Sequence, residues 1–236
     1  MPVHRAGFVN IIGKPNVGKS TLMNALVGEK LSIVTSKAQT TRHRIIGIVN
    51  GDDFQIVFSD TPGIIKPAYK MQQGMISLVK TAITDADVLL YMTDMHESKL
   101  PEKGIIEKLQ TSKIPLIALV NKIDLSVQEA VEDKISSMKK LFPDAKVLPV
   151  SALHSFNLGQ LLELIKDFLP EAPAFYPDGT LTDRPERFFI SEIIREKIFL
   201  AYKQEVPYCC EVCIDEFKET DKIIHIRALI YVGRDS

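Results

Sequence analysis

The sequence feature that most constrains the fold is the segment GKPNVGKS at residues 13–20. It matches the pattern G-x-x-x-x-G-K-S/T, follows the apolar run FVNII and precedes TLMNALVG, which is typical of a helix start. In such a unit the glycines let the backbone approach a ligand, and N–H groups at the helix N-terminus converge on phosphate oxygens. The segment therefore predicts a phosphate-binding loop, in which Lys19 reaches the β- and γ-phosphates of a nucleotide and Ser20 binds Mg²⁺.

Short apolar runs alternate with helical patterns through the first 170 residues. The runs lie at residues 8–12, 54–59, 87–92, 114–120 and 146–150. Their nearly unbroken hydrophobicity indicates strands buried on both faces of a mostly parallel sheet. Met71, Met75, Leu78, Val79 and Ala82 are spaced as one face of a helix, and residues 161–169 predict a closing helix. We predict an α/β domain of the P-loop NTPase type, with a doubly wound sheet, over residues 5–170.

The composition changes beyond residue 170. Residues 169–187 contain four prolines, which disfavour helix, and we interpret residues 171–186 as a linker. Residues 187–204 predict an amphipathic helix whose isoleucines, Ile190, Ile193, Ile194 and Ile198, face inward. Two alternating strands follow, with inward faces at Tyr208, Cys210, Val212 and Ile214 and at Ile224, Ile226, Ala228, Ile230 and Val232. This predicts a small α+β segment after the main domain.

The overall composition excludes several classes of protein. The net charge of −1 gives no global attraction to nucleic acid. Three cysteines, two of them adjacent, do not form a disulfide framework. The N-terminal residues lack the apolar core of a signal peptide, and no apolar run approaches the ~20 residues that span a bilayer. We therefore expect a soluble, cytoplasmic protein.

Two further segments fit the metal and γ-phosphate side of a nucleotide site. Asp60, in DTPG after the apolar run at residues 54–59, is placed to support Mg²⁺, and Gly63 to offer its N–H to the γ-phosphate. Taken alone this tetrapeptide is only a turn. The polar residues 36–44 suit a loop that becomes ordered around a γ-phosphate and Mg²⁺. We choose Thr41 as the metal ligand from this loop, with Thr40 as the alternative.

The base-binding side is predicted from NKID at residues 121–124, which follows the run at 114–120. Asp124 can accept from guanine N1–H and its 2-amino group, a pair of donors that adenine does not present. Asn121 would bond near N7, and the stem of Lys122 would cover the ring. Ser151, Ala152 and Leu153 follow the next strand, and the N–H of Ala152 could reach the guanine 6-oxygen. At the carboxyl edge of a parallel sheet these motifs favour guanine.

These five segments, in this order, resemble those of the small GTPases related to translation factors. The sequence of residues 13–45, together with DTPGI and a helix–strand–strand segment after a proline-rich linker, resembles that of the Era family. The resemblance implies a GTPase with GTP/GDP and Mg²⁺ as ligands. It also implies a KH domain that binds small-subunit ribosomal RNA during assembly of the 30S-type subunit. The family resemblance further suggests a monomer that is cytoplasmic, with peripheral association at the inner face of the plasma membrane as an additional expectation.

Residues 187–236 then correspond to part of a KH domain, and the sequence would end within it. KH modules grip nucleic acid with a GxxG loop. No GxxG occurs after residue 185, and residues 181–236 contain nine Lys/Arg against eleven Asp/Glu. RNA binding by this chain alone is therefore left open.

Ile64 occupies the position at which Ras-like GTPases carry a water-orienting glutamine. An isoleucine neither donates nor accepts, so catalysis must use the backbone, Mg²⁺, bound ions or a partner, and slow intrinsic turnover is expected. A related group of GTPases uses K⁺ with a loop asparagine as ligand, and Asn16 has the corresponding position. The alternative for Asn16 is loop geometry, because Asn tolerates turns.

The predicted site comprises three overlapping sets. The catalytic set is Lys19, Thr41 and Gly63, and the metal set is Ser20, Thr41 and Asp60. The nucleotide set is Gly13, Asn16, Val17, Gly18, Lys19, Ser20, Thr21, Asp60, Asn121, Lys122, Asp124, Ser151, Ala152 and Leu153. Competing hypotheses are an ATP-using kinase or ATPase, a module whose nucleotide is only structural, and a GTPase of RNA modification or another switch GTPase without a role on ribosomal RNA.

Overall fold

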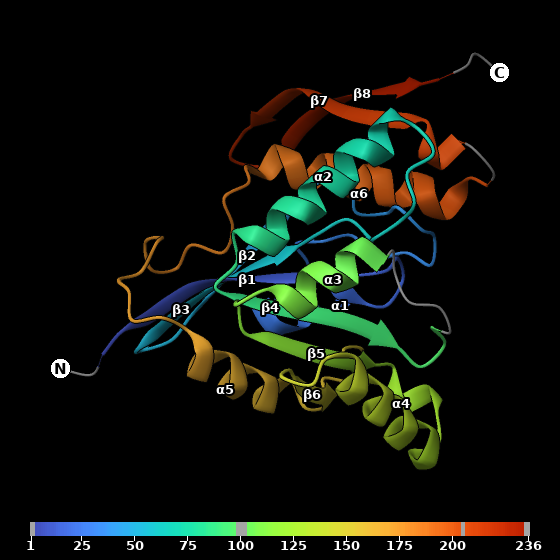
Figure 1. Ribbon diagram of the computed structural model, residues 1–236. Helices are drawn as coiled ribbons and strands as arrows, with labels where there is room; N and C mark the ends of the chain where they lie inside the picture. Colours follow the sequence, from blue (N-terminus) through green and yellow to red (C-terminus); the bar gives the residue numbers. More distant parts are fainter. Residues whose placement is uncertain (1–2, 98–102, 204–205, 234–236) are drawn as a thin grey trace.

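The computed structural model describes residues 3–97, 103–203 and 206–233 (Figure 1). Its main feature is a six-stranded sheet in the order β2-β3-β1-β4-β5-β6. The strands are β1 (Arg5–Gly13), β2 (Ile45–Asn50), β3 (Phe54–Asp60), β4 (Val88–Asp94), β5 (Leu116–Asn121) and β6 (Lys146–Pro149). All neighbours pair in parallel except β2, which is antiparallel to β3. This confirms the mostly parallel α/β sheet of the P-loop type.

Helices cover both faces of this sheet. They are α1 (Lys19–Val27), α2 (Lys70–Thr84), α3 (Lys103–Thr111), α4 (Gln128–Leu141) and α5 (Leu158–Phe168). One apolar cluster joins α1 and α5 to the sheet through residues such as Leu22 and Leu161. The second joins α2, α3 and α4 through Val79, Ile106 and Met138. Because every residue of β4 is buried between these two layers, its sequence is continuously apolar at its start.

The predicted strands match β1, β3, β4, β5 and β6, but the sequence analysis did not identify β2. This strand lies at the sheet edge, and its burial does not alternate regularly, so no clear two-residue period marks it. The predicted α2 face is correct at Met75, Val79 and Ala82. It is wrong at Met71, which is exposed because it lies in the first turn of the helix.

After α5 the chain runs back along the β2 edge of the sheet. Gln55 holds this segment, since its Oε1 accepts from the N–H groups of Phe175 and Tyr176 at 2.7 and 3.0 Å. The N–H of Ile48 donates to the carbonyl of Leu181 at 2.9 Å. The proline-rich segment is thus fixed against the sheet although it has no helix or strand of its own.

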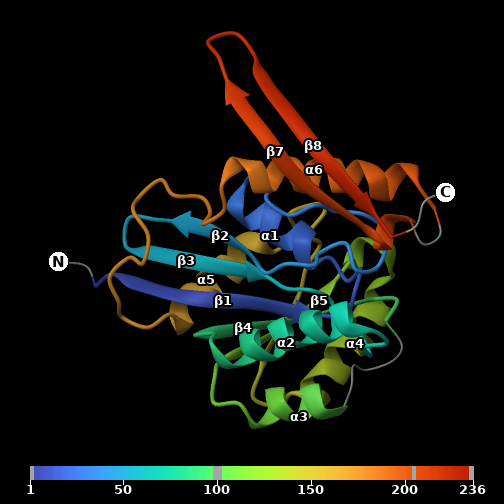
Figure 2. The same ribbon diagram turned by 90° about the horizontal axis from the view of Figure 1, so that it is seen from above.

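The C-terminal part consists of α6 (Glu186–Ala201), β7 (Cys210–Glu219) and β8 (Ile224–Val232). The two strands form an antiparallel hairpin, and α6 lies between this hairpin and the large sheet (Figure 1). In Figure 2 the hairpin crosses α6 and its tip extends beyond the helix. Residues 204–205 and 234–236, which belong to the predicted C-terminal domain, lie outside the described residues. Within the described ranges no helix is long and apolar enough to cross a membrane.

The side chains that α6 buries differ from the prediction. Ile198 is buried, but Ile193 is 49% exposed, and Ile190 and Ile194 are only half-buried. The inner face instead carries Glu192, Arg195 and Glu196. These charged side chains are buried because they face a polar loop of the main domain: Arg195 donates to the Thr40 carbonyl, and Glu196 accepts from the N–H of Val34. On β8 the predicted inner face is also wrong, because its isoleucines and Val232 are exposed and only Ala228 is half-buried.

Candidate functional site

The loop between β1 and α1 approaches its neighbours closely at Gly18. This residue has φ 105° and precedes α1. A Cβ at this position would lie 2.3 Å from Nδ2 of Asn121, so only glycine fits the contact. A cavity of about 420 Å³ lies in front of the loop and is lined by residues such as Lys19, Ser20, Gly63 and Lys122. The first residues of α1, Lys19 to Thr21, line this cavity, so the N-terminus of the helix lies where a phosphate site requires it.

Lys19 is buried at this cavity. Its Nζ donates to the carbonyl of Lys14 at 2.8 Å. Burial lowers the pKa of Lys19 to about 8, and the negative charges of Asp60 and Glu97 partly offset that effect. Burial of the charged ammonium group therefore costs desolvation free energy, which a negatively charged phosphate beside it would offset.

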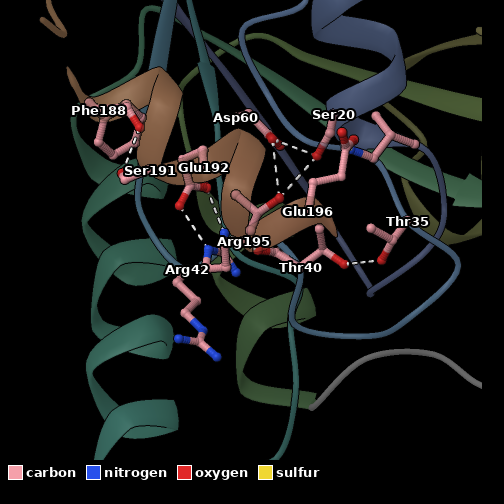
Figure 3. A network of polar contacts seen from close by, with 12 residues as sticks. Ser20, Thr35, Thr40, Arg42, Asp60, Phe188, Ser191, Glu192, Arg195 and Glu196 are labelled. Carbon is pink, nitrogen blue, oxygen red and sulfur yellow. Dashed lines mark hydrogen bonds and ion pairs between the residues drawn. The ribbon is translucent and has the colours of Figure 1, made fainter. Parts of the chain in front are cut away.

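Ser20, Thr41 and Asp60 converge from three different segments. The Ser20 hydroxyl donates to Asp60 Oδ2 at 2.6 Å (Figure 3). It also lies 3.0 Å from Thr41 Oγ1, which in turn lies 3.4 Å from Asp60 Oδ2. Asp60 Oδ1 is buried and makes no hydrogen bond within the described part of the chain. Burial raises the pKa of Asp60, opposed by the charge of Lys19 and the bond from Ser20. Two hydroxyls and a carboxylate with a free oxygen fit the hard oxygen ligands of Mg²⁺.

Thr40 and Thr41 point to different partners. The Thr40 hydroxyl lies 2.6 Å from that of Thr35 and donates to the Lys37 carbonyl at 2.7 Å. Thr40 therefore stabilises the irregular segment between α1 and β2, which we call the switch loop (residues 33–44). Thr41 is the threonine that the structure brings to Ser20 and Asp60.

The segments predicted to bind the base meet at the carboxyl ends of β5 and β6. Asn121 is buried, donates to the Val17 carbonyl at 2.7 Å and accepts from the N–H of Ala152 at 3.0 Å. It therefore ties the phosphate loop to both base-binding motifs. In this arrangement the Ala152 N–H, expected at the guanine 6-oxygen, is directed to Asn121. The side chain of Leu153 is exposed.

Asp124 and Lys122 are each oriented by a neighbour. The Ser151 hydroxyl donates to Asp124 Oδ1 at 2.6 Å. Lys122 Nζ donates to Asp94 Oδ2 and to the Asn16 carbonyl, both at 2.6 Å. The Lys122 stem thus lies across the gap between the phosphate loop and the base-binding strand. Asp94, at the end of β4, was missed in the sequence, although a charged residue at that end of a buried strand is a detectable signal.

Gly63 and Ile64 are packed against the phosphate loop. A Cβ on Gly63 would lie 2.6 Å from the Pro15 nitrogen, and the N–H of Ile64 donates to the Gly13 carbonyl at 3.0 Å. The Ile64 side chain is 4% exposed and belongs to the apolar cluster that includes Ile12, Val79 and Tyr91. It is directed into the core and is not part of the lining of the phosphate cavity.

The remaining predicted residues belong to the phosphate loop itself. Asn16 has φ 63°, which its residue type tolerates, and its Nδ2 donates to the Ser36 carbonyl at 2.8 Å. Its side chain therefore bridges the phosphate loop and the switch loop. Gly13 is the last residue of β1, and Val17 is a buried residue of the loop. Thr21 lies in the first turn of α1 and lines the cavity.

Comparison with known proteins supports the same interpretation. Residues 8–122 match the family model described as 50S ribosome-binding GTPase. The chain is 41% identical over 238 residues to GTPase Era of Staphylococcus haemolyticus, and the match covers 100% of this chain and 80% of that protein.

Two solved Era structures have nearly the same fold. Era in complex with MgGDPNP and nucleotides 1506–1542 of 16S ribosomal RNA is 37% identical, with a TM-score of 0.92 over 98% of this chain and 80% of that one. A tyrosine-to-alanine variant of Aquifex aeolicus Era bound to GDP and AlF4⁻ gives 37% identity and 0.91 over the same shares. With this identity over its whole length, on a sheet that presents the phosphate, metal and base motifs at one edge, the chain belongs to the Era family of GTPases.

Proposed function

We propose that this GTPase binds GTP across the carboxyl edge of its sheet and acts as a switch in assembly of the small ribosomal subunit. The observation that carries the proposal is the convergence of Ser20, Thr41 and Asp60 beside a phosphate loop that Asn121 joins to the base-binding motifs. One end of this arrangement suits a triphosphate with Mg²⁺, and the other suits guanine. The phosphate loop, the proposed metal ligands and the base-binding motifs lie on different elements. Only a ligand that extends from the metal to the base would contact all three.

At the phosphate end, Ser20, Thr41 and Asp60 would hold the metal, and Mg²⁺ would neutralise charge that develops on the phosphates. Lys19 would contact the β- and γ-phosphates, and the N–H of Gly63 would face the γ-phosphate. At the base end, Asp124 would accept from guanine, and Ser151 would keep its carboxylate in place. Asn121, Lys122 and Ala152 would complete the base pocket.

We infer slow intrinsic hydrolysis. Ile64 is buried in the core, so no side chain from position 64 orients the attacking water. We propose that Asn16 would contribute its side-chain oxygen to a K⁺ site beside the phosphates; its Nδ2 donates to the Ser36 carbonyl at 2.8 Å, which holds the side chain between the phosphate loop and the switch loop. A carbonyl and an amide oxygen are suitable ligands for such an ion. Turnover in KCl and NaCl at equal ionic strength tests this part, and equal rates would exclude a K⁺ role.

The RNA-related part rests on the relatives. An Era protein has been crystallised with the 3′ region of 16S ribosomal RNA. For this chain we propose small-subunit ribosomal RNA and the 30S-type subunit as partners, with a monomeric state, a cytoplasmic location and peripheral contact with the inner face of the plasma membrane. The alternative is a GTPase of RNA modification or another switch GTPase without a role on ribosomal RNA.

Two measurements test the proposal. Calorimetry with Mg²⁺ should show binding of GDP and GTP, with no displacement by ATP, and Lys19→Ala should lose hydrolysis that the parent shows. Equal competition by ATP would refute guanine recognition. A gel-shift titration with the 16S fragment, against a scrambled RNA of equal length, separates the ribosomal role from the alternative.

A further inference from the structure

Helix α6 contacts the switch loop along its length. Lys37 Nζ donates to the carbonyls of Phe199 and Tyr202 at the C-terminal end of α6. Glu196 accepts from the N–H of Val34 at 3.3 Å and from Lys30 at 2.8 Å. The position of a cation at a helix C-terminus is electrostatically favourable. The loop has no helix or strand of its own, so these contacts supply order that its local sequence does not.

Arg42 extends the same contact beyond the helix. Its guanidinium donates to the carbonyls of Cys210, Pro207 and Tyr208 at 2.8, 3.0 and 3.0 Å. Arg42 is next to Thr41 in the chain. The switch loop is therefore held by the C-terminal segment on both sides of the proposed metal ligand.

Arg195 contacts Thr40, the residue that precedes Thr41 in the chain (Figure 3). It is 3% exposed and donates to the Thr40 carbonyl at 2.6 Å. Glu192, itself 4% exposed, fixes the guanidinium by accepting from Nε at 2.8 Å and from Nη2 at 2.5 Å. The bond to Thr40 is thus charge-assisted, buried and oriented by a second buried residue, which makes it strong and directional.

The Thr40 carbonyl and the Thr41 N–H belong to one planar trans peptide, in which the two groups point in opposite directions. When Arg195 holds the carbonyl toward α6, the N–H of Thr41 must face away from α6. The orientation of that peptide also sets the direction in which Thr41 Oγ1 leaves the chain. Losing the anchor would let the peptide rotate and move the hydroxyl away from Ser20 and Asp60.

We propose that Arg195 is a positioning residue for Mg²⁺-dependent GTP hydrolysis, acting through the Thr40–Thr41 peptide. This rests on the proposed role of Thr41 as metal ligand. Because GDP without metal needs neither Thr41 nor the γ-phosphate contacts, the role should appear in hydrolysis and in its Mg²⁺ dependence, and not in metal-free GDP affinity. Loss of a residue that only stabilised the fold would change hydrolysis, its Mg²⁺ dependence and the metal-free GDP affinity together.

The test compares four variants of the full chain with the parent. They are Arg195→Gln, the double variant Arg195→Gln with Glu192→Gln, Lys197→Gln and Thr41→Ala. Lys197 is an exposed residue of the same helix and controls for the loss of one positive charge. The double variant removes both buried charges, so it avoids leaving Glu192 buried and unpaired. GDP affinity in EDTA, by calorimetry, reports whether the nucleotide site is folded.

Both Arg195 variants should lose about tenfold to a hundredfold in kcat, the range expected for one buried hydrogen bond from a charged donor. They should need more Mg²⁺ for half-maximal rate and keep parental GDP affinity in EDTA, while Lys197→Gln should resemble the parent. If Arg195→Gln does not bind GDP, it is not folded, and the kcat and Mg²⁺ dependence of the double variant then test the inference. Parental kcat and Mg²⁺ dependence in either folded Arg195 variant would overturn the inference. Parental hydrolysis in Thr41→Ala would instead refute the metal assignment.

Discussion

Replacement of Ile64 by glutamine tests whether a side chain at this position can take part in hydrolysis. By analogy with Ras-like enzymes, the substitution would supply a water-orienting amide and increase turnover. The structure gives the opposite expectation. Ile64 is 4% exposed and packs with Ile12, Val79 and Tyr91, so a glutamine with the same direction would place its amide in the apolar core.

The cost of Ile64→Gln has two parts. Loss of buried apolar surface costs about 1–2 kcal/mol, since part of the aliphatic stem is retained. Burial of an amide without hydrogen-bond partners costs a further ~1–3 kcal/mol. The free energy of unfolding should therefore fall by about 2–5 kcal/mol. With a urea m-value of about 2–3 kcal/mol/M, the unfolding midpoint should fall by roughly 1–2 M.

The assay pairs urea unfolding, followed by circular dichroism, with single-turnover GTP hydrolysis at a temperature where the variant is folded. Ile64→Leu serves as the control, because a volume-conserving apolar change should cost less than about 1.5 kcal/mol. We expect no gain in turnover for Ile64→Gln. A variant that unfolds at the parental midpoint and hydrolyses GTP at least tenfold faster would show that this side chain reaches the nucleotide.

Three further predictions address the ligand site. Asp124→Asn should lower GTP affinity by about a hundredfold or more and favour xanthine nucleotides, because an amide can donate to the 2-oxo group; unchanged GTP affinity in a filter-binding assay would contradict this. Since burial lowers the pKa of Lys19 to about 8, the free site loses its positive charge above that pH. Calorimetric GDP affinity should therefore be constant from pH 6.5 to about 7.5 and fall as pH rises through about 8, and a constant affinity up to pH 9 would be inconsistent with a phosphate-binding ammonium. Gly18→Ala should reduce GDP affinity at least about tenfold, because its Cβ would meet Asn121 Nδ2 at 2.3 Å. Gly28→Ala, where φ is 81° but nothing lies within 4 Å, strains the backbone alone and should leave that affinity unchanged.

The parts of the fold that follow from the sequence are those with one dominant physical cause. Parallel strands that are buried on both faces are continuously apolar, so apolar runs in the sequence identify β1, β3, β4, β5 and β6. The edge strand β2 is antiparallel to β3 and only partly buried. Its sequence therefore shows neither a continuous apolar run nor a regular alternation. Periodicity alone does not reveal it.

The candidate site divides in a similar way. Ser20, Asp60 and Asn121 were predicted because motifs at strand ends determine their place. The contacts of Glu192 and Arg195 were not, because helical periodicity assigns charged residues to solvent. These residues are buried only because α6 packs on a polar loop, and that is a property of the tertiary arrangement.

The three residues proposed to bind Mg²⁺ differ in how firmly the fold holds them. Ser20 lies in the first turn of α1 and Asp60 ends β3, so the apolar core fixes both whether or not a nucleotide is present. Asn121, at the end of β5, is fixed in the same way at the base side. Thr41 alone lies on a loop whose order depends on contacts with another part of the chain. Affinity for GDP should therefore depend mainly on the rigid elements, whereas discrimination between GTP and GDP should depend on how Thr41 is held, to which the contact of Arg195 with the Thr40 carbonyl contributes.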